Sequence, residues 1–471
     1  MRVLDTSSGE FAELKPKGLP YAILSHTWDE NGEQSHQDVR DIQHSWDHRS
    51  RSFLVLARQA VFFGFFLIIS RIFHIVAVAL CHGHLTGSLT FRLCSSRRQH
   101  FVSQLKNWSG IFRDTSMACY FPFTMLMDTA LSEKLRGACA VALADGYRYI
   151  WIDSCCIDKT SSSELSEAIN SMYLWYRDTV ICYAYLADVL SGEDPRAPDS
   201  SFRRSRWFTR GWTLQELIAP RRVVFLAQDW HILGTKHSLG DVVAEVTGID
   251  YDVLAYTKSL DAISVATRMS WASNRKTTRV EDEAYSLLGI FDIIMTPVYG
   301  EGERAFRRLQ EEILKRIPDQ TLFAWGSIYA AGPLLSTGEA TDSALTLPGD
   351  DLLRICYIEP HPQLATLFAP SPSSFAHARD IHPIPRAEFS RLLGLEGLPF
   401  EEYATSPSGI RTHFPLVVLK ADHALPVSIN IRFGANPPVS DTCLVLLACW
   451  DSEQQLLARI CEVRPGNGGP D

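Results

Sequence analysis

The sequence predicts an α/β fold in which a parallel sheet is flanked by helices. Residues 149–153 (YIWID) are apolar on both faces of a strand, as strands of parallel sheets are when helices cover both sides. Residues 179–186 (TVICYAYL) form a second β-rich run, and an amphipathic helical segment separates the two. A strand, a helix and a second strand in this order indicate a right-handed βαβ crossover.

Segments on either side extend this pattern. Residues 21–25 (YAILS) are a short apolar run followed by a polar loop. This pattern is typical of a buried strand. An Ala-rich helix is expected over 132–146, where Gly146 closes it. Ser161 and Glu164 form a capping box that starts the amphipathic helix. Residues 222–227 (RVVFLA) supply a further strand, so the pattern becomes βαβαβ.

The rest of the chain differs from this α/β part in its pattern of helix and strand signals. Helical signals dominate up to residue 318, and short β-rich runs separated by Pro- and Gly-containing loops follow. These runs are 321–325, 414–419, 427–433, 443–449 and 457–463. The predicted regions are an α/β core at 1–42 and 132–230, an atypical insertion at 43–131, a helical continuation at 231–318 and a β-rich C-terminal region at 319–471.

The insertion at 43–131 mixes Arg, His, Ser, Phe and Cys without helix or strand periodicity over most of its length. Within it, residues 61–80 (VFFGFFLIISRIFHIVAVAL) approach the length and apolarity of a membrane span, although Arg71 makes burial in lipid costly. Three interpretations stay open: a membrane span or anchor, a buried helical insertion, and translated sequence that was never selected to fold. The α/β pattern resumes after it as though nothing had intervened.

Composition excludes several classes of protein. The chain has 471 residues, 46% of them apolar, which is enough for two or three domains with real cores. A net charge of −9 argues against sequence-independent binding of nucleic acid, which needs a basic face. Eleven cysteines without a CxxC pair are typical of reduced thiols in the cytoplasm. The N-terminal residues lack the apolar segment of a secretory signal.

The densest motif is 206–220 (RWFTRGWTLQELIAP), which holds two tryptophans, a phenylalanine and the internal carboxylate of Glu216. Pro220 ends its helix after barely two turns, so packing of the aromatic residues must hold it. Two roles are open for Glu216. It can complete a capping box with Thr213, or it can be an active-site carboxylate beside the carboxyl edge of the parallel sheet.

Ligands of open parallel sheets bind outside the carboxyl ends of the strands, and several predicted strands here end in polar residues. With Glu216 as the candidate catalytic residue, the candidate binding residues are Ser25, His26, Trp28, Asp29, Asp153 and Trp212. The structural alternatives are a hydrogen-bonded core histidine for His26 and a loop-capping acid for Asp153.

Other chemistry is not indicated. Cys155 and Cys156 fit small core residues better than nucleophiles, because no neighbour in the sequence lowers a thiol pKa. No histidine and cysteine spacing predicts a metal site, and no cofactor is expected. The Gly300-Glu-Gly302 stretch lacks the preceding strand and the Lys-Ser/Thr ending of a phosphate-binding loop.

Taken together, four ordered blocks resemble the fungal heterokaryon-incompatibility (HET) domain. They are YAILSHTW (21–28), YIWIDSCCIDK (149–159), ELSEAINSMYLWYRD (164–178) and RGWTLQELIAP (210–220), and the likeness continues through 281–293 and 297–313. The chain departs from the family at Asp29, where a glycine commonly follows the tryptophan, and at the 43–130 segment.

The resemblance implies a cytoplasmic fungal protein that triggers programmed cell death after non-self recognition, a form of innate immunity. Its implied partners are other HET or death-signalling proteins or a second copy in a homo-oligomer, and membrane association only if 61–80 is a real span. HET domains are also similar to TIR domains, which have a flavodoxin-like parallel sheet. By that likeness Glu216 corresponds to the glutamate with which TIR enzymes cleave NAD. A signalling module and a TIR-like NAD glycohydrolase with NAD as substrate are therefore both expected alternatives.

Overall fold

The computed structural model describes residues 1–14, 19–29, 32–49, 124–326, 328–330, 355–358, 367–393, 403–406, 409–418 and 441–463. They fall into two compact units. The first unit consists of Met1–Leu14 and Glu33–Asp158, and the second of Lys15–Gly32 and Lys159–Asp471. The chain thus leaves the second unit after one strand and returns to it later.

The first unit holds three strands in the order β2-β1-β4, all antiparallel. They are β1 (Arg2–Asp5), β2 (Phe11–Glu13) and β4 (Tyr149–Ile152), with helical residues 36–49, η1 (Met125–Met127), α3 (Glu133–Ala144) and α4 (Asp153–Cys156) around them. The hydroxyl of Ser132 accepts a hydrogen bond from the Leu135 N–H and so caps α3, the predicted Ala-rich helix.

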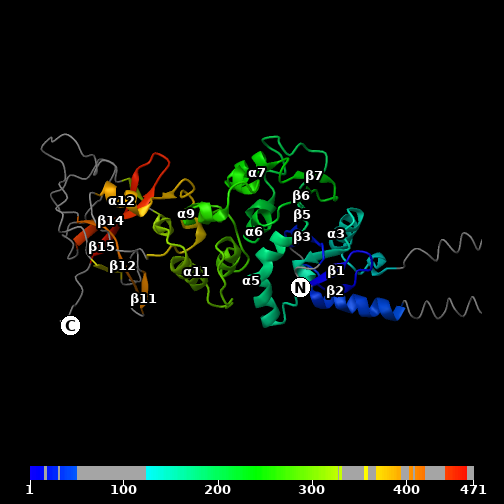
Figure 1. The fold of residues 1–471 in the computed structure, drawn as a ribbon. Coiled ribbons are helices and arrows are strands. Elements are labelled where there is room, and N and C mark those ends of the chain that lie inside the picture. The colour runs from blue at the N-terminus through cyan, green and yellow to red at the C-terminus, as the bar shows by residue number, and fades with distance from the viewer. Residues whose placement is uncertain are drawn as a thin grey trace, which may run out of the picture. The chain divides into compact units, whose positions relative to one another are not determined.

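The second unit is built on parallel strands. β3 (Ala22–His26) pairs with β5 (Ile181–Tyr185), β5 pairs with β6 (Val223–Leu226), and both pairs are parallel. β7 (Ile232–Thr235) is an edge strand of the sheet and pairs with β6 in the antiparallel direction. Every residue of β3 and β5 is buried, as the two-sided apolar runs predict. The predicted α/β class, a sheet with parallel strands flanked by helices, is confirmed (Figure 1).

Helices surround this sheet and continue beyond it. The longest is α5 (Ser162–Asp178), whose capping hydroxyl is that of Ser161, as the sequence predicts. The others are α6 (Thr213–Ile218), α7 (Gly240–Thr247), α8 (Tyr251–Leu254), α9 (Val265–Ser270), α10 (Asp282–Tyr285) and α11 (Arg304–Arg316), with the 3-10 turns η2 (Arg206–Thr209), η3 (Leu260–Ala262), η4 (Leu288–Ile290) and η5 (Gln320–Phe323).

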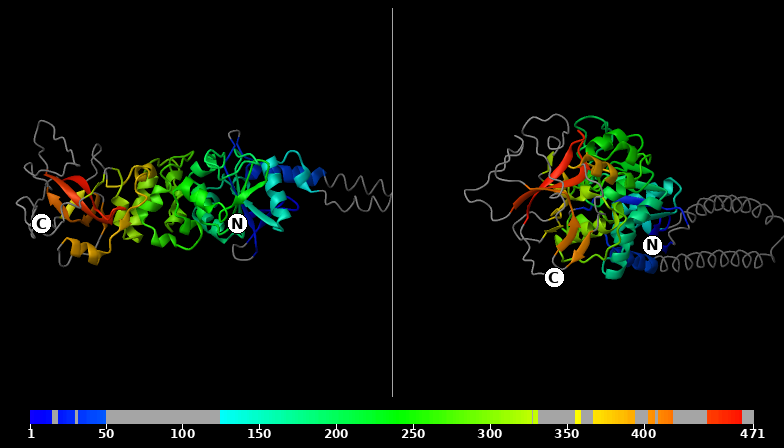
Figure 2. Two further views of the ribbon diagram at one scale, coloured as in Figure 1. Left: turned by 90° about the horizontal axis from the view of Figure 1, so that it is seen from above. Right: turned by 60° about the vertical axis from the view of Figure 1, so that its left-hand side comes forward.

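The C-terminal part is antiparallel. One sheet has the order β10-β14-β15-β8 with β13 beside β14, and another has the order β11-β12-β9. The elements are β8 (Tyr329–Ala330), β9 (Ile355–Ile358), η7 (Pro372–Phe375), β10 (His382–Pro383), α12 (Arg386–Leu392), β11 (Ala404–Ser406), β12 (Gly409–His413), β13 (Leu416–Val418), β14 (Asp441–Trp450) and β15 (Leu456–Val463). Figure 2 shows β14 and β15 side by side as the longest arrows of this region.

Buried amides join the helical part to the C-terminal part. The side chain of Gln310 on α11 exchanges two hydrogen bonds with the backbone of Ala369, at 2.8 and 2.9 Å. The side-chain oxygen of Gln320 accepts a hydrogen bond from the Ala448 N–H of β14 at 2.7 Å. Because both glutamines are buried, these bonds replace water and fix how the two parts pack.

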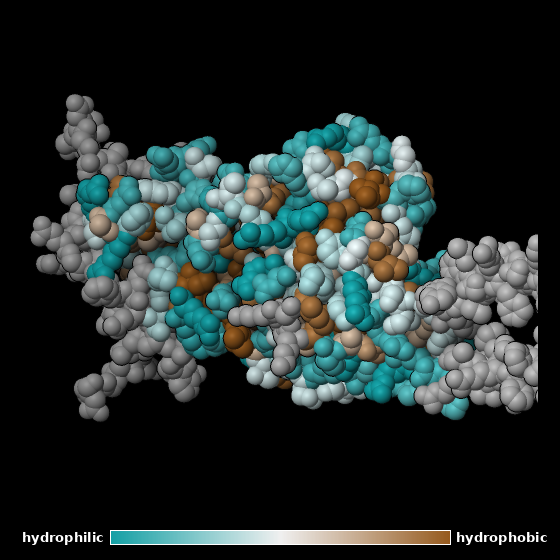
Figure 3. Space-filling view, turned by 45° about the vertical axis from the view of Figure 1, so that its right-hand side comes forward, coloured by the Kyte–Doolittle hydropathy of each residue, from teal (hydrophilic) through white to brown (hydrophobic). Residues whose placement is uncertain are grey.

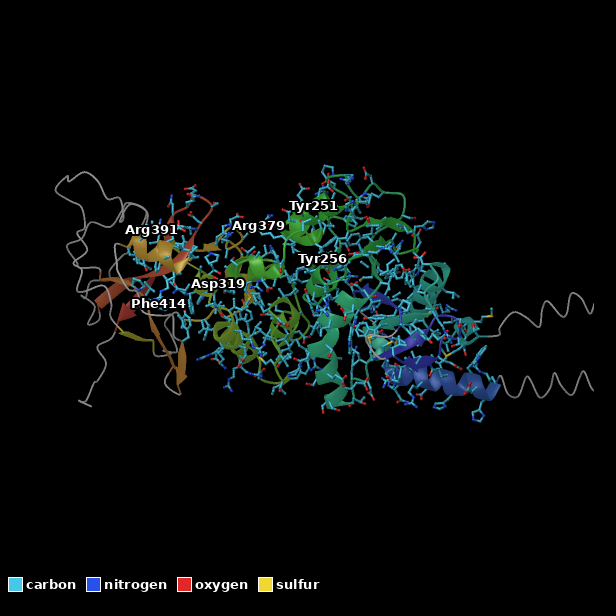
Figure 4. The ribbon with its side chains drawn as sticks, viewed as in Figure 1. Tyr251, Tyr256, Asp319, Arg379, Arg391 and Phe414 are labelled. Carbon is cyan, nitrogen blue, oxygen red and sulfur yellow. The ribbon has the colours of Figure 1, made fainter. Side chains whose placement is uncertain are left out.

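The predicted strand at 321–325 is wrong, because η5 occupies this position. Asp319, labelled in Figure 4, accepts hydrogen bonds from the Thr321 N–H at 2.9 Å and from the Val265 N–H of α9 at 2.8 Å. This carboxylate starts a helical turn and overrides the β propensity of the residues that follow. The runs at 414–419, 443–449 and 457–463 are strands, and the run at 427–433 lies outside the described residues.

None of the helices in the described ranges is long and apolar enough to cross a membrane, and the 61–80 stretch lies outside those ranges. On the face shown in Figure 3, hydrophilic side chains separate the hydrophobic patches from one another.

Candidate functional site

Helix α6 is buried along its whole length, which is unusual for six residues with a glutamate among them. The loop before α6 and the strand β6 contribute a cluster of aromatic side chains that contact one another. Trp207 meets Phe208 and Phe225 edge to face at centroid distances of 5.2 and 5.8 Å, and Phe202 meets Phe208 and Phe225 at 5.2 Å each. Burial of these rings stabilises a helix too short to form alone, as the sequence predicts.

The carboxylate of Glu216 accepts a hydrogen bond from the hydroxyl of Ser25 at the carboxyl end of β3. The same hydroxyl accepts a hydrogen bond of 2.8 Å from the indole N–H of Trp207. Glu216 is only 6% exposed and Ser25 and Trp207 are fully buried. The structure therefore brings Ser25 and Glu216 together, as the strand-end argument predicts, in a chain of buried hydrogen bonds.

The capping box between Thr213 and Glu216 is not formed. Trp212 occupies the N-cap position, and its side chain makes no capping hydrogen bond. Thr213 is the first helical residue, and its hydroxyl donates to the carbonyl oxygens of Trp207 and Arg210 rather than accepting a helix N–H. The local sequence signature fails because the turn at Gly211 places the threonine one position too far into the helix.

Arg275 lies at the N-terminal end of α6, and the sequence gives no signal for it. Its guanidinium donates to the Thr213 hydroxyl at 3.0 Å, to the Arg210 carbonyl at 2.9 Å and to the Trp271 carbonyl at 3.1 Å. Burial lowers the pKa of this guanidinium, while the negative charge of Glu216 acts in the opposite direction. Arg275 and Glu216 thus form an electrostatic pair inside the unit.

Residues 275–278 run beside the loop that leads into α6. The Lys276 N–H donates to the Thr209 carbonyl at 2.7 Å, and the Gly211 N–H donates to the Lys276 carbonyl at 2.9 Å. We call residues 275–278 the clamp strand, although its β pairing consists of one isolated parallel bridge between Lys276 and Arg210. It leaves so little room at Gly211 that a Cβ atom there would lie 2.4 Å from the Cγ2 atom of Thr277. Glycine is therefore required at this position for close approach.

The opposite end of α6 is held by a buried lysine and a tyrosine. The Lys236 ammonium donates to the carbonyl oxygens of Leu217 and Pro220, and the Tyr256 hydroxyl donates to those of Ile218 and Ala219. These are the carbonyls that a helix C-terminus leaves without partners. Lys236 is 3% exposed, and its ammonium lies 4.7 Å from the centre of the Tyr256 ring. Figure 4 labels Tyr256, which follows α8.

Stability should depend on pH through Lys236. Burial lowers its pKa to about 7, whereas an unfolded lysine titrates near 10.4. Above about pH 7 the folded state releases a proton that the unfolded state keeps, so stability rises with pH by up to about 1.4 kcal/mol per unit. Burial also raises the pKa of Cys182, which interacts with Lys236 and Glu216. The raised thiol pKa lowers stability only where an unfolded thiol ionises, at about pH 8.5 and above.

The expected result is that the unfolding midpoint of the full chain increases between about pH 7 and about pH 8.5. Lys236→Met, which keeps the length of the side chain and removes the titrating amine, should lose that increase. Lys276→Met is the matched control, because Lys276 is exposed. A midpoint that rises equally in all three proteins would contradict the assignment to Lys236.

Trp212 contacts a second buried carboxylate. Its indole hydrogen-bonds to the carboxylate of Asp282 on α10, which also accepts a hydrogen bond of 2.9 Å from the Tyr299 hydroxyl. Burial raises the pKa of Asp282, although both hydrogen bonds favour its charged form. Trp212 therefore anchors α6 to the helical part of the unit.

The 300–302 loop shows why it is no phosphate site. The carboxylate of Glu281 accepts hydrogen bonds from the N–H groups of Gly300 and Gly302 at 2.7 and 3.1 Å. The hydroxyl of Tyr285 accepts from the Val298 N–H and donates to Glu301, both at 2.7 Å. The loop's backbone donors are thus occupied by an internal anion.

The remaining candidate residues differ in burial and in the unit to which they belong. His26 is buried at 7% exposure, whereas Trp28 is 42% exposed and lies under the Lys159 ammonium at 3.6 Å from its ring centre. Asp29 is exposed beside it. Asp153 begins α4 in the first unit, whereas Glu216 belongs to the second.

Cys155 and Cys156 behave as core residues. Both are buried, and burial raises the pKa of the Cys155 thiol well above its usual range. A thiol held protonated in this way is a poor nucleophile. The structure therefore agrees with the core interpretation of this pair.

Comparison with known proteins gives two family matches. Residues 118–195 match the family described as heterokaryon incompatibility protein (HET), and residues 304–470 match a domain of unknown function (DUF8212). The chain is also 48% identical over 188 residues to the vegetative incompatibility protein HET-E-1 of Podospora anserina. That alignment covers 39% of this chain and 14% of the relative. No solved structure matches the chain. One part of the chain, residues 118–195, is therefore similar to the heterokaryon-incompatibility (HET) family.

Proposed function

We propose that this protein is an effector of heterokaryon incompatibility that triggers cell death by self-association or by binding a partner. The observation that carries the proposal is the 48% identity to a protein named for vegetative incompatibility. In this proposal Glu216 is structural. Its buried carboxylate joins β3 to α6 through Ser25, and Arg275 compensates its charge.

A TIR-like NAD glycohydrolase is the second candidate, and one observation favours it. Thr213 is not the N-cap residue of α6, and Glu216 lies at the carboxyl end of a parallel strand beside Ser25, where α/β enzymes place their chemistry. The burial of the carboxylate argues against this candidate, because Glu216 is only 6% exposed. A catalytic carboxylate has to contact the ribose whose bond it breaks.

Inducible expression of the full chain in a filamentous fungus, with cell viability and total NAD followed together, tests the two candidates. On our proposal the cells die before NAD declines. Glu216→Gln keeps an acceptor for the Ser25 hydroxyl and should cost about 1 kcal/mol of stability while cell killing continues.

The matched control is Glu133→Gln, because the Glu133 side chain is 94% exposed. Loss of NAD that precedes death, and that disappears together with killing in Glu216→Gln but not in Glu133→Gln, would replace our proposal with the enzyme. Self-association is checked separately by light scattering of the purified full chain. A strictly monomeric protein that still kills would leave partner binding as the route.

A further inference from the structure

The hydroxyl of Thr278 contacts an arginine on the surface of the second unit. Thr278 ends the clamp strand and is exposed. Its oxygen accepts a hydrogen bond of 3.2 Å from a guanidinium N–H of Arg210. Lys276 and Arg279 flank it in the sequence, and both are exposed.

Among the described residues, no carboxylate lies within ion-pair distance of Arg210, Lys276 or Arg279. Arg279 lies over the Tyr299 ring at 4.3 Å and is attracted by Glu281 and Asp282. Both of these carboxylates are already engaged in hydrogen bonds. On a chain of net charge −9, Arg210 thus places a guanidinium without an ion-pair partner among the described residues beside an exposed hydroxyl, an arrangement that suits an anion.

We propose that Thr278 is a phosphorylation site whose phosphate is bound by Arg210. A protein kinase would transfer the γ-phosphoryl group of a nucleoside triphosphate to the Thr278 oxygen. The new bond joins that oxygen to phosphorus, the bond to the β,γ-bridging oxygen breaks, the hydroxyl proton passes to the kinase's base, and the nucleoside diphosphate leaves.

The phosphate would strengthen a contact that already exists. It carries a charge of about −1.5 to −2 and three strong acceptor oxygens, which suit the planar fork of an arginine. Arg210 belongs to the loop that leads into α6, and Thr278 belongs to the clamp strand. Phosphorylation therefore adds a charge-assisted link across the two segments that position Glu216. The inference is independent of whether Glu216 is structural or catalytic.

Genetically encoded phosphothreonine at position 278 of the full chain tests the link by hydrogen exchange. Amides of residues 207–213 should exchange about tenfold more slowly than in the unmodified chain, because a hydrogen bond between charged groups contributes about 1.5 kcal/mol or more. The slowing should shrink at high salt and vanish in Arg210→Ala. Arg210→Lys, which keeps the charge and loses the fork, should keep only part of it.

Phosphothreonine at position 257 is the matched control. Thr257 is also exposed, but its hydroxyl contacts the Asp252 carboxylate at 3.0 Å, so a phosphate there is repelled and should slow no exchange. Exchange at 207–213 that is unchanged by phosphothreonine at position 278, or slowed equally by the control, overturns the proposal.

Whether the modification occurs is tested by mapping phosphorylated residues on the full chain isolated from a filamentous fungus. We expect phosphate on Thr278 and its loss in Thr278→Val. Protein recovered without phosphate at this position would refute the inference.

Discussion

Gly211→Ala is expected to destabilise the protein by about 2 to 3 kcal/mol, because the added methyl group has no room. The Cβ atom would meet the Thr277 methyl group at 2.4 Å, well inside van der Waals contact. Thr277 cannot move away easily, since its hydroxyl donates to the Arg279 carbonyl at 2.6 Å and the clamp strand is hydrogen-bonded to Thr209 and Gly211. The measurement is the denaturant midpoint of the full chain.

A second substitution separates overpacking from loss of backbone freedom. Thr277→Ser removes the offending methyl group and keeps the hydroxyl, so Gly211→Ala with Thr277→Ser should recover most of the lost stability. Gly211→Ala alone should also speed hydrogen exchange in α6. If the single variant is as stable as the parent, the clamp strand does not press on Gly211 in solution.

Arg275→Met should cost about 3 kcal/mol, because it removes three hydrogen bonds of a buried guanidinium and the compensating charge for Glu216. Methionine keeps the apolar contacts of the side chain. Arg279→Met is the matched control in the same loop. It loses one exposed cation–π contact with Tyr299 and should cost less than about 1 kcal/mol.

A double-mutant cycle tests the electrostatic part of this prediction. Glu216→Gln should cost less in the Arg275→Met background than in the parent, since the carboxylate there has already lost its compensating charge. Additive effects would show that Arg275 and Glu216 act independently, and equal effects of Arg275→Met and Arg279→Met would remove Arg275 from the site.

The elements that the sequence predicts best are those whose signals are local. The two-sided apolar runs at β3 and β5 and the Ser161 cap of α5 need no knowledge of distant residues, and all three are confirmed. The strand β1 and the edge strand β7 carry no such signal. Arg2–Asp5 is short, and Ile232–Thr235 is half exposed, so their pairing depends on neighbours far along the chain.

The candidate site divides in the same way. The rule that ligands gather at strand ends correctly predicts that Ser25 lies near Glu216. These two hydrogen-bonded residues are 191 positions apart in the chain. The rule does not find Arg275, Lys236 or Asp282, because each acts on backbone or side-chain groups of the α6 segment from a separate part of the helical continuation. The capping box fails for the opposite reason, since a four-residue signature cannot register the tertiary contacts that shift where a helix begins.

The pairing of β3 with β5 also bears on synthesis of the chain. Ala22 leaves the ribosome about 160 residues before its partner Ile181. At roughly 5 to 20 residues per second, the edge of β3 that pairs with β5 waits about 8 to 30 seconds for its partner strand. A nascent chain in this state is a substrate for holding chaperones. The yield of folded protein should therefore respond to translation speed between residues 26 and 181.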